Sequence, residues 1–205
     1  MKLLHLPSAP VSAPRTGFRQ RFKSALRPIL DRVLAGSDDS AAGFAVRVIT
    51  PETRYVTVRA DGPRLIQIVI ELVRNLPQPL GVALVAYRAE PEEWVHGTVG
   101  RGRVLEMLLG LGDLTGRGHF DLAIFSQAQE MEIILDRYGV LEVRGASWNL
   151  PHIRGAALAA GLEERKSISP IPGAAPPPIW DSATTQRVAH LRDWLELVLV
   201  SARDA

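Results

Sequence analysis

The residues 96–103 form the glycine-rich stretch in which a binding site would be sought first. They read His-Gly-Thr-Val-Gly-Arg-Gly-Arg. A glycine-rich loop that opens a helix can hold a phosphate group with its backbone N–H groups, and Arg101 and Arg103 would add charge-assisted contacts. The stretch lacks the GxxxxGK[ST] spacing of a P-loop and the ordered GxGxxG of a dinucleotide site. The pattern therefore favours a surface loop, with an anion site as the alternative.

The residue types that most often carry catalysis show no familiar spacing. His96, His119 and His152 belong to neither an HExxH nor an HxH pattern, so no metal-ligand spacing is present. The serines lack GxSxG and SxxK contexts. The chain has no cysteine, which excludes thiolate zinc sites, disulfides and cysteine nucleophiles. We expect no catalytic residue, metal or cofactor, and an unrecognised enzyme site using His96 or His119 beside a carboxylate is an alternative.

A basic amphipathic segment lies near the N-terminus. Apolar residues fall on one arc of a helix predicted over residues 16–35, which Pro28 interrupts or kinks. Basic residues border that arc: Arg15, Arg19, Arg21, Lys23, Arg27 and Arg32. Such a helix can contact a membrane, a phosphate backbone or a partner groove. The pattern favours packing on a sheet, with basic side chains reaching water. Nucleic-acid or polyanion binding through Arg15, Arg19, Arg21, Lys23, Arg27, Arg101 and Arg103 is the alternative.

The rest of the chain predicts hairpins followed by helices. Alternating apolar residues predict strands over 43–50 and 54–60, and again over 131–136 and 140–144. A continuous apolar run over 81–87 predicts a central strand, and residues 120–126 predict another. Helical periodicity appears over 63–76, 102–109, 150–164 and 184–202. We predict the α+β class: a mixed, mostly antiparallel sheet built from hairpins, with helices packed on it, a basic N-terminal helix and a long C-terminal helix.

The second hairpin carries the candidate partner-binding residues. Met131, Ile133 and Leu135 alternate toward the core, so Glu132 and Asp136 are predicted to point away from it. Glu130, Glu132, Asp136 and Tyr138 are therefore the side chains that we expect to contact a partner. The link 137–139 fits a three-residue turn whose glycine adopts the left-handed conformation.

Composition predicts an ordinary packed protein. The chain has 205 residues, of which 46% are hydrophobic and 22% charged, with a net charge of +2. We predict a flexible arm over 1–14 and one domain over 15–205, with a Pro-rich strap over 169–178.

No segment approaches the roughly 20 apolar residues of a membrane span, and we expect a cytoplasmic location. The absence of catalytic motifs favours a non-enzymatic protein-binding module of the immunity, adaptor or assembly-factor type, whose partner is another protein.

Overall fold

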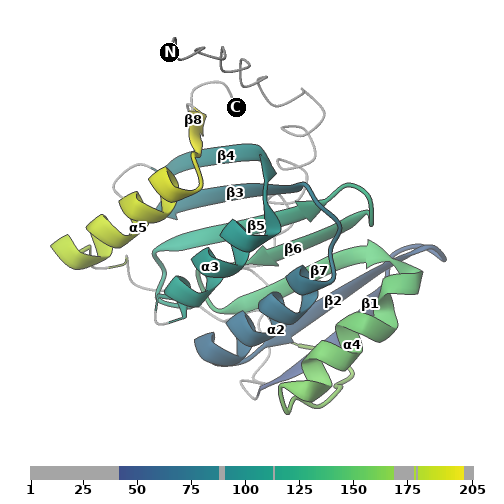
Figure 1. Cartoon of the computed structure of the whole chain (residues 1–205). Helices are drawn as coiled ribbons and strands as arrows, with labels where there is room; N and C mark the ends of the chain where they lie inside the picture. Colours follow the sequence, from purple (N-terminus) through teal and green to yellow (C-terminus); the bar gives the residue numbers. More distant parts are fainter. Residues whose placement is uncertain (1–41, 88–90, 113, 169–177, 179, 201–205) are drawn as a thin grey trace, which may run out of the picture.

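A computed structural model describes residues 42–87, 91–112, 114–168, 178 and 180–200 (Figure 1). The sheet contains the strands β1 (Gly43–Val48), β2 (Thr53–Arg59), β3 (Leu80–Tyr87), β4 (Pro91–Val99), β5 (Phe120–Ser126), β6 (Met131–Leu135), β7 (Val140–Ala146) and β8 (Val198–Val200). Their order across the sheet is β1-β2-β7-β6-β5-β3-β4-β8, and every neighbouring pair is antiparallel. The predicted α+β class is therefore confirmed, and the sheet is antiparallel throughout its described part.

The described helices lie on one face of this sheet (Figure 1). They are α2 (Gly62–Arg74), α3 (Arg101–Leu111), α4 (Leu150–Ala159) and α5 (Ser182–Trp194), with a short 3₁₀ turn over Ser147–Asn149 before α4. The main hydrophobic core lies between these helices and the sheet. We call this side the helix face, and we call the opposite side of the sheet the second face.

Side-chain alternation along each strand divides the apolar residues between the two faces. Ile133 belongs to the main core and is 1% exposed, whereas its neighbour Ile134 is 4% exposed and belongs to a smaller cluster on the second face. This follows from the two-residue period of a strand, which points consecutive side chains in opposite directions. The smaller cluster comprises Ala83, Val85, Val95, Ala123 and Ile134, with Tyr87 and Phe125 packed against it.

The two predicted hairpins are confirmed and share one sheet. The strands β1 and β2 form the first hairpin, β6 and β7 form the second, and β2 pairs with β7. Gly139, in the turn of the second hairpin, has φ +79°, the left-handed conformation predicted for it. The strand predicted over 81–87 is confirmed as β3, which is buried on both faces. The strand predicted over 120–126 is confirmed as β5.

The long C-terminal helix predicted over 184–202 is wrong beyond Trp194. The helix α5 begins after Asp181, whose carboxylate accepts a hydrogen bond from the Thr184 backbone N–H at 2.6 Å. It ends where Glu196 adopts φ +55° and the Leu197 N–H donates to the Arg192 carbonyl at 3.0 Å. The apolar residues that follow form β8, which pairs with β4. In residues 198–200, the predicted helix is thus replaced by a strand that pairs at the edge of the sheet.

Two further boundaries differ from the sequence prediction. The strand β4 was missed, because its carboxylates and Gly97 resemble a solvated turn, whereas pairing with β3 holds it extended. The helix predicted over 150–164 ends at Ala159, because Gly161 has φ +75° and the Leu162 N–H donates to the Ala157 carbonyl.

Several predicted features lie outside the described residues. These are the arm over 1–14, the basic helix over 16–35 and nearly all of the strap over 169–178. Within the described part of the chain, the helices are all too short or too polar to cross a membrane.

Candidate functional site

A groove of about 640 Å³ opens on the helix face, between α2 and α4 and beside the end of α3. Its apolar walls come from Ile66 and Ile70 of α2, Leu109 of α3, and Pro151, Ala156 and Ala159 of α4. This volume lies in the range of natural ligand sites. The groove is therefore a candidate binding surface on the described residues.

The sequence of α2 explains why its apolar surface extends beyond the core. Asp61 caps the helix by accepting a hydrogen bond from the Arg64 backbone N–H at 3.0 Å, and Pro63 occupies the first turn. Leu65, Leu72 and other apolar residues of this helix are fully buried in the main core. Ile70 lies beside this face and is only half-buried, so it lines the groove. The wide apolar arc of α2 thus contributes residues both to the main core and to the groove.

Small residues leave the groove open. A Cβ atom built at Gly155 in α4 would meet nothing within 4 Å, and the same is true of Gly112 after α3. Both glycines line the groove, together with two alanines of α4. Any larger side chain at these positions would project into space that a ligand could occupy. The volume of the groove therefore depends on the absence of side chains along α4.

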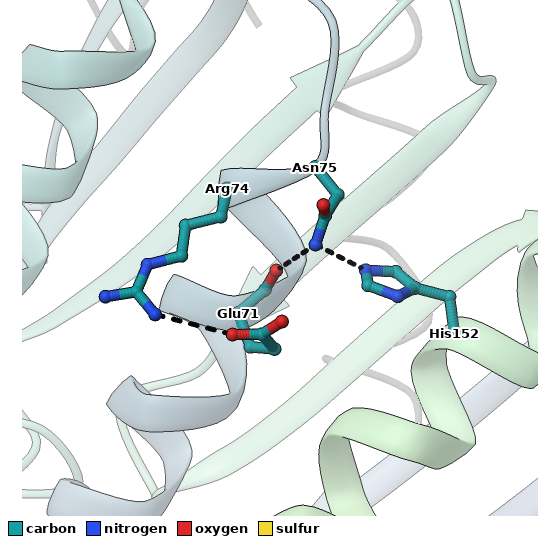
Figure 2. Close-up of polar contacts among 4 residues, drawn as sticks. All are labelled: Glu71, Arg74, Asn75 and His152. Carbon is teal, nitrogen blue, oxygen red and sulfur yellow. Dashed lines mark hydrogen bonds and ion pairs between the residues drawn. The ribbon is translucent and has the colours of Figure 1, made fainter.

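The polar rim gathers where α2 ends and α4 begins (Figure 2). The Arg74 guanidinium lies 3.5 Å from the Glu71 carboxylate, and both side chains are largely exposed. Asn75 donates a hydrogen bond to the Glu71 carbonyl at 3.1 Å, and its Nδ2 lies 3.5 Å from His152 Nε2 (Figure 2). The first turn of α4 contains no acidic residue. This end of the groove therefore combines Arg74, His152 and the positive end of a helix dipole.

The lining of the groove combines apolar walls with a polar rim. Its titratable lining residues are Glu71, Arg74 and His152, and its described lining holds no serine, threonine or tyrosine hydroxyl. A nucleophile paired with an oriented base, which acyl transfer needs, does not occur among these residues. Apolar walls with a polar rim are instead the arrangement found in interfaces between proteins.

A cluster of buried carboxyl groups lies elsewhere, at the ends of β3, β5 and β6. Asp121 accepts hydrogen bonds from the Tyr87 hydroxyl at 2.5 Å and from the Arg137 backbone N–H at 2.7 Å. Asp136 accepts from the Tyr138 and Val140 backbone N–H groups at 2.9 and 2.8 Å. The bonds from the Arg137, Tyr138 and Val140 N–H groups stabilise the β6–β7 turn, while the Tyr87 bond links β3 to β5.

Burial dominates the electrostatics of this cluster. It raises the pKa of Asp136 to about 7, and the neighbouring Asp121 adds to the rise. Burial also raises the pKa of Asp121, against the hydrogen bond from Tyr87 and the charge of Arg137. The pKa of Tyr87 is raised by burial and by Asp121. The Arg137 guanidinium lies 3.9 Å from the centroid of the Tyr87 ring, which partly balances the negative charge.

Trp180 contacts Tyr87 and His119 beside this cluster. Its indole N–H donates to the Tyr87 carbonyl at 2.7 Å, and its ring meets the edge of His119 with 5.2 Å between centroids. His119 is buried, and its charge interacts with that of Asp181, the cap of α5. This histidine therefore packs against Trp180 near the start of α5.

The structure does not bring the four predicted partner-binding residues together. Glu130 is exposed in the turn before β6, where it adopts φ +49°, while Tyr138 lies in the turn at the opposite end of that strand. Glu132 lies between them on the second face. Asp136 is only 8% exposed, so the prediction that it points into solvent is wrong. Strand alternation does turn it away from the main core, but the second face is buried at that point.

Arg101 and Arg103 already bond to other groups of the protein. Arg101 donates to the Arg74 and Leu76 carbonyls at 3.0 and 3.2 Å, which completes the C-terminal end of α2. Arg103 forms an ion pair of 2.8 Å with Glu196. The basic residues Arg15, Arg19, Arg21, Lys23 and Arg27 lie outside the described residues.

No group of three or more potential metal ligands occurs in the part of the chain that the structure describes.

Sequence reasoning missed the groove, although it contained one signal for it. Ile66 and Ile70 widen the apolar arc of α2 beyond the stripe that one sheet can cover, and this excess marks a second contact surface. The role of α4 could not be read in the same way, because Gly155 matters there through the side chain that it lacks.

Comparison with models of protein families, with curated proteins and with solved structures found no match to this chain.

Proposed function

We propose that this protein is a non-enzymatic protein-binding module that holds an amphipathic helix of a partner protein in the α2–α4 groove. The observation that carries the proposal is the half-open groove of about 640 Å³, with apolar walls and a polar rim. Binding of an amphipathic helix in such a groove is a recurrent mode of peptide recognition. The immunity, adaptor or assembly-factor role expected from the sequence fits a module of this kind, and we retain the expected cytoplasmic location.

The lining residues define the chemistry of the partner helix. Apolar side chains at positions i, i+3 or i+4, and i+7 would contact Ile66, Ile70 and Leu109, since this spacing places them on one stripe. Leu109 is 73% exposed, so burying it would remove a large apolar side chain from water. An acidic residue at one end of the partner helix would face Arg74 and His152.

The alternatives receive less support from the described residues. Polyanion binding at the glycine-rich stretch would need Arg101 and Arg103 to leave their present hydrogen bonds and ion pair. Catalysis at His119 would need an open path to a histidine that is 6% exposed and packed against Trp180. The apolar walls of the groove are open to a ligand, and only the exposed Arg74–Glu71 pair at its rim would have to adjust.

A display library of helical peptides provides the test. Selection on the full chain is expected to enrich peptides with apolar residues at i, i+3 or i+4, and i+7, together with a terminal acid. The variant Gly155→Leu fills the groove in space that is open in the wild type. It is expected to weaken the selected peptides at least about tenfold, which equals about 1.4 kcal/mol.

The matched control is Glu130→Lys, which changes the exposed turn of the predicted binding hairpin. It is expected to leave peptide affinity unchanged, while thermal melting shows that both variants are folded. Equal peptide affinity for the wild type and Gly155→Leu would overturn the groove as the binding surface. Loss of affinity in Glu130→Lys alone would move the proposal back to the hairpin.

A further inference from the structure

The second face of the sheet is buried, although the described helices all lie on the other side (Figure 1). Val85 is 6% exposed, Val95 2% and Ile134 4%. On a sheet face open to water, alternating side chains of this size stand largely in solvent. A further part of the protein must therefore lie against these residues.

The second face has a definite chemical pattern. A stripe of aligned side chains crosses four strands, from Ile134 on β6 through Ala123 and Ala83 to Val95 on β4. Two of its four members are alanines, so the stripe forms a shallow trough that accepts large side chains from a covering segment. At its β7 end, the partner of Ile134 across the strands is Glu142. Glu132, on β6 beside Phe125, and Glu93, on β4 beside Val85, flank the stripe.

We propose that residues 16–35 of this chain lie across the second face as its covering helix. Phe18, Phe22 and Leu26 lie on the apolar arc of this segment, and they supply the large side chains that the alanine trough lacks. Basic residues border the arc on both sides, where they meet the glutamates that flank the stripe. The apolar and charged patterns of the two surfaces are thus complementary.

The other segments outside the described residues do not fit this face. Residues 88–90 and 201–205 are too short to cover a stripe four strands wide, and residues 169–177 contain three prolines before Pro177 and no basic side chain. Prolines at this density prevent a continuous helix. Among these segments, 1–41 alone combines large apolar and basic residues.

The connection between this helix and the sheet is long enough. The described chain begins at residue 42, beside the outer strand β1, and three strand spacings separate β1 from β6. Those spacings total about 14 Å. The seven residues 36–42 can span about 23 Å when extended, and the helix predicted over 16–35, which Pro28 interrupts or kinks, is at most about 30 Å long. Covalent attachment also gives the segment a high effective concentration at the face.

Thiol labelling tests whether this segment covers the second face. Because the chain has no cysteine, a single introduced thiol reports one position. Ala123→Cys places it on the second face, and Ala86→Cys places the matched control on the helix face. Both alanines are at most 2% exposed. In the full chain, the proposal predicts slow labelling at both positions.

The charge-insertion variant Phe22→Asp/Leu26→Asp is then combined with each cysteine in the full chain. We expect labelling at Ala123→Cys to accelerate on the order of 100-fold, through local exposure, while labelling at Ala86→Cys changes less than about threefold. Unchanged labelling at Ala123→Cys would overturn the proposal. If the double variant unfolds globally, labelling accelerates at both positions. The cross-link described next then decides whether residues 16–35 cover the second face.

A zero-length carbodiimide cross-link provides the independent measurement. The chain has three lysines, Lys2, Lys23 and Lys166, so a link from Lys23 to Glu132, Glu142 or Glu93 would identify the contact directly. We expect this link within one chain, at a yield independent of protein concentration, and its loss in Lys23→Arg. Links that form only between isotopically mixed chains would assign the face to a second copy. The absence of any link from Lys23 to these glutamates would also overturn the proposal.

Discussion

The two faces of the sheet bury side chains of different chemistry. The helix face contains large branched residues such as Leu65, Leu72 and Ile133, which interlock with four helices. The second face combines alanines with carboxyl groups, among them Asp121, Asp136 and Glu142, which are all less than 9% exposed. The first face is stabilised mainly by apolar burial. The second also buries groups that prefer water, so its stability depends on hydrogen bonds and on proton uptake.

The difference shows which changes each face tolerates. On the helix face, a lost methyl group leaves a cavity, whose cost depends on how well its neighbours relax. On the second face, the decisive quantity is whether each buried polar atom retains a partner. Four predictions test how the effect of a substitution depends on its place in the fold.

The largest effect expected at a fixed pH comes from neighbouring isoleucines on β6. Ile133→Ala removes a side chain from the helix face, and Ile134→Ala removes the same atoms from the second face. Ile133→Ala is expected to lower the free energy of unfolding by about 4 kcal/mol and Ile134→Ala by about 3 kcal/mol. Urea denaturation of the full chain measures both. A loss below about 1 kcal/mol for Ile134→Ala alone would mean that the second face is open to water.

The next effect concerns the pH dependence that Asp136 gives to the second face. Its pKa is about 7 in the folded protein and 3.8 in an exposed chain, so the folded state keeps a proton that the unfolded chain releases. The free energy of unfolding therefore falls as the pH rises from about 4 to about 7, by about 1.4 kcal/mol per pH unit. Below about 4 and above about 7, this contribution is level.

Asp136→Asn is expected to remove that slope, because its amide oxygen can still accept from the two backbone N–H groups of the turn. A slope of the same sign remains from Asp121, whose pKa is also raised by burial. Denaturation at a series of pH values from 4 to 8 makes the comparison. Parallel profiles for the wild type and Asp136→Asn would show that this carboxyl group does not titrate there.

A smaller effect is expected at Trp180, which packs against the main core and contacts Tyr87 and His119. Trp180→Phe keeps an aromatic ring against His119 but removes the N–H that donates to the Tyr87 carbonyl. The loss of one such hydrogen bond costs about 1 kcal/mol, measured by thermal or chemical denaturation. A loss of several kcal/mol would instead indicate that Trp180 acts mainly through apolar packing.

The smallest effect has the opposite sign. Gly155→Ala in α4 adds a Cβ in open space and removes the entropic cost of a helical glycine. It is expected to raise the free energy of unfolding by about 0.5–1 kcal/mol, with the melting temperature as the readout. A destabilised Gly155→Ala would show that the groove is narrower than the structure indicates.

The sequence predicted the elements whose local pattern agrees with their final environment. Alternation placed Ile133 toward the core, and the position of Gly139 indicated the hairpin turn. Periodicity alone could not show that residues 198–200 pair with β4, because that choice depends on a strand distant in sequence. It could not reveal the burial of Asp136 or the groove at Gly155 either, since both depend on packing between distant elements.

The short strand β8 also limits how copies of this protein can associate. It is the outer strand beyond β4, yet it pairs only with Glu93, Trp94 and Val95. Val198 and Leu199 are exposed by more than half, so a longer strand here would present an apolar template to other chains. At three residues, with Pro91 at the start of its neighbour, this edge offers few backbone groups for intermolecular pairing. Over the described residues, the outermost strand thus offers little edge for edge-to-edge aggregation.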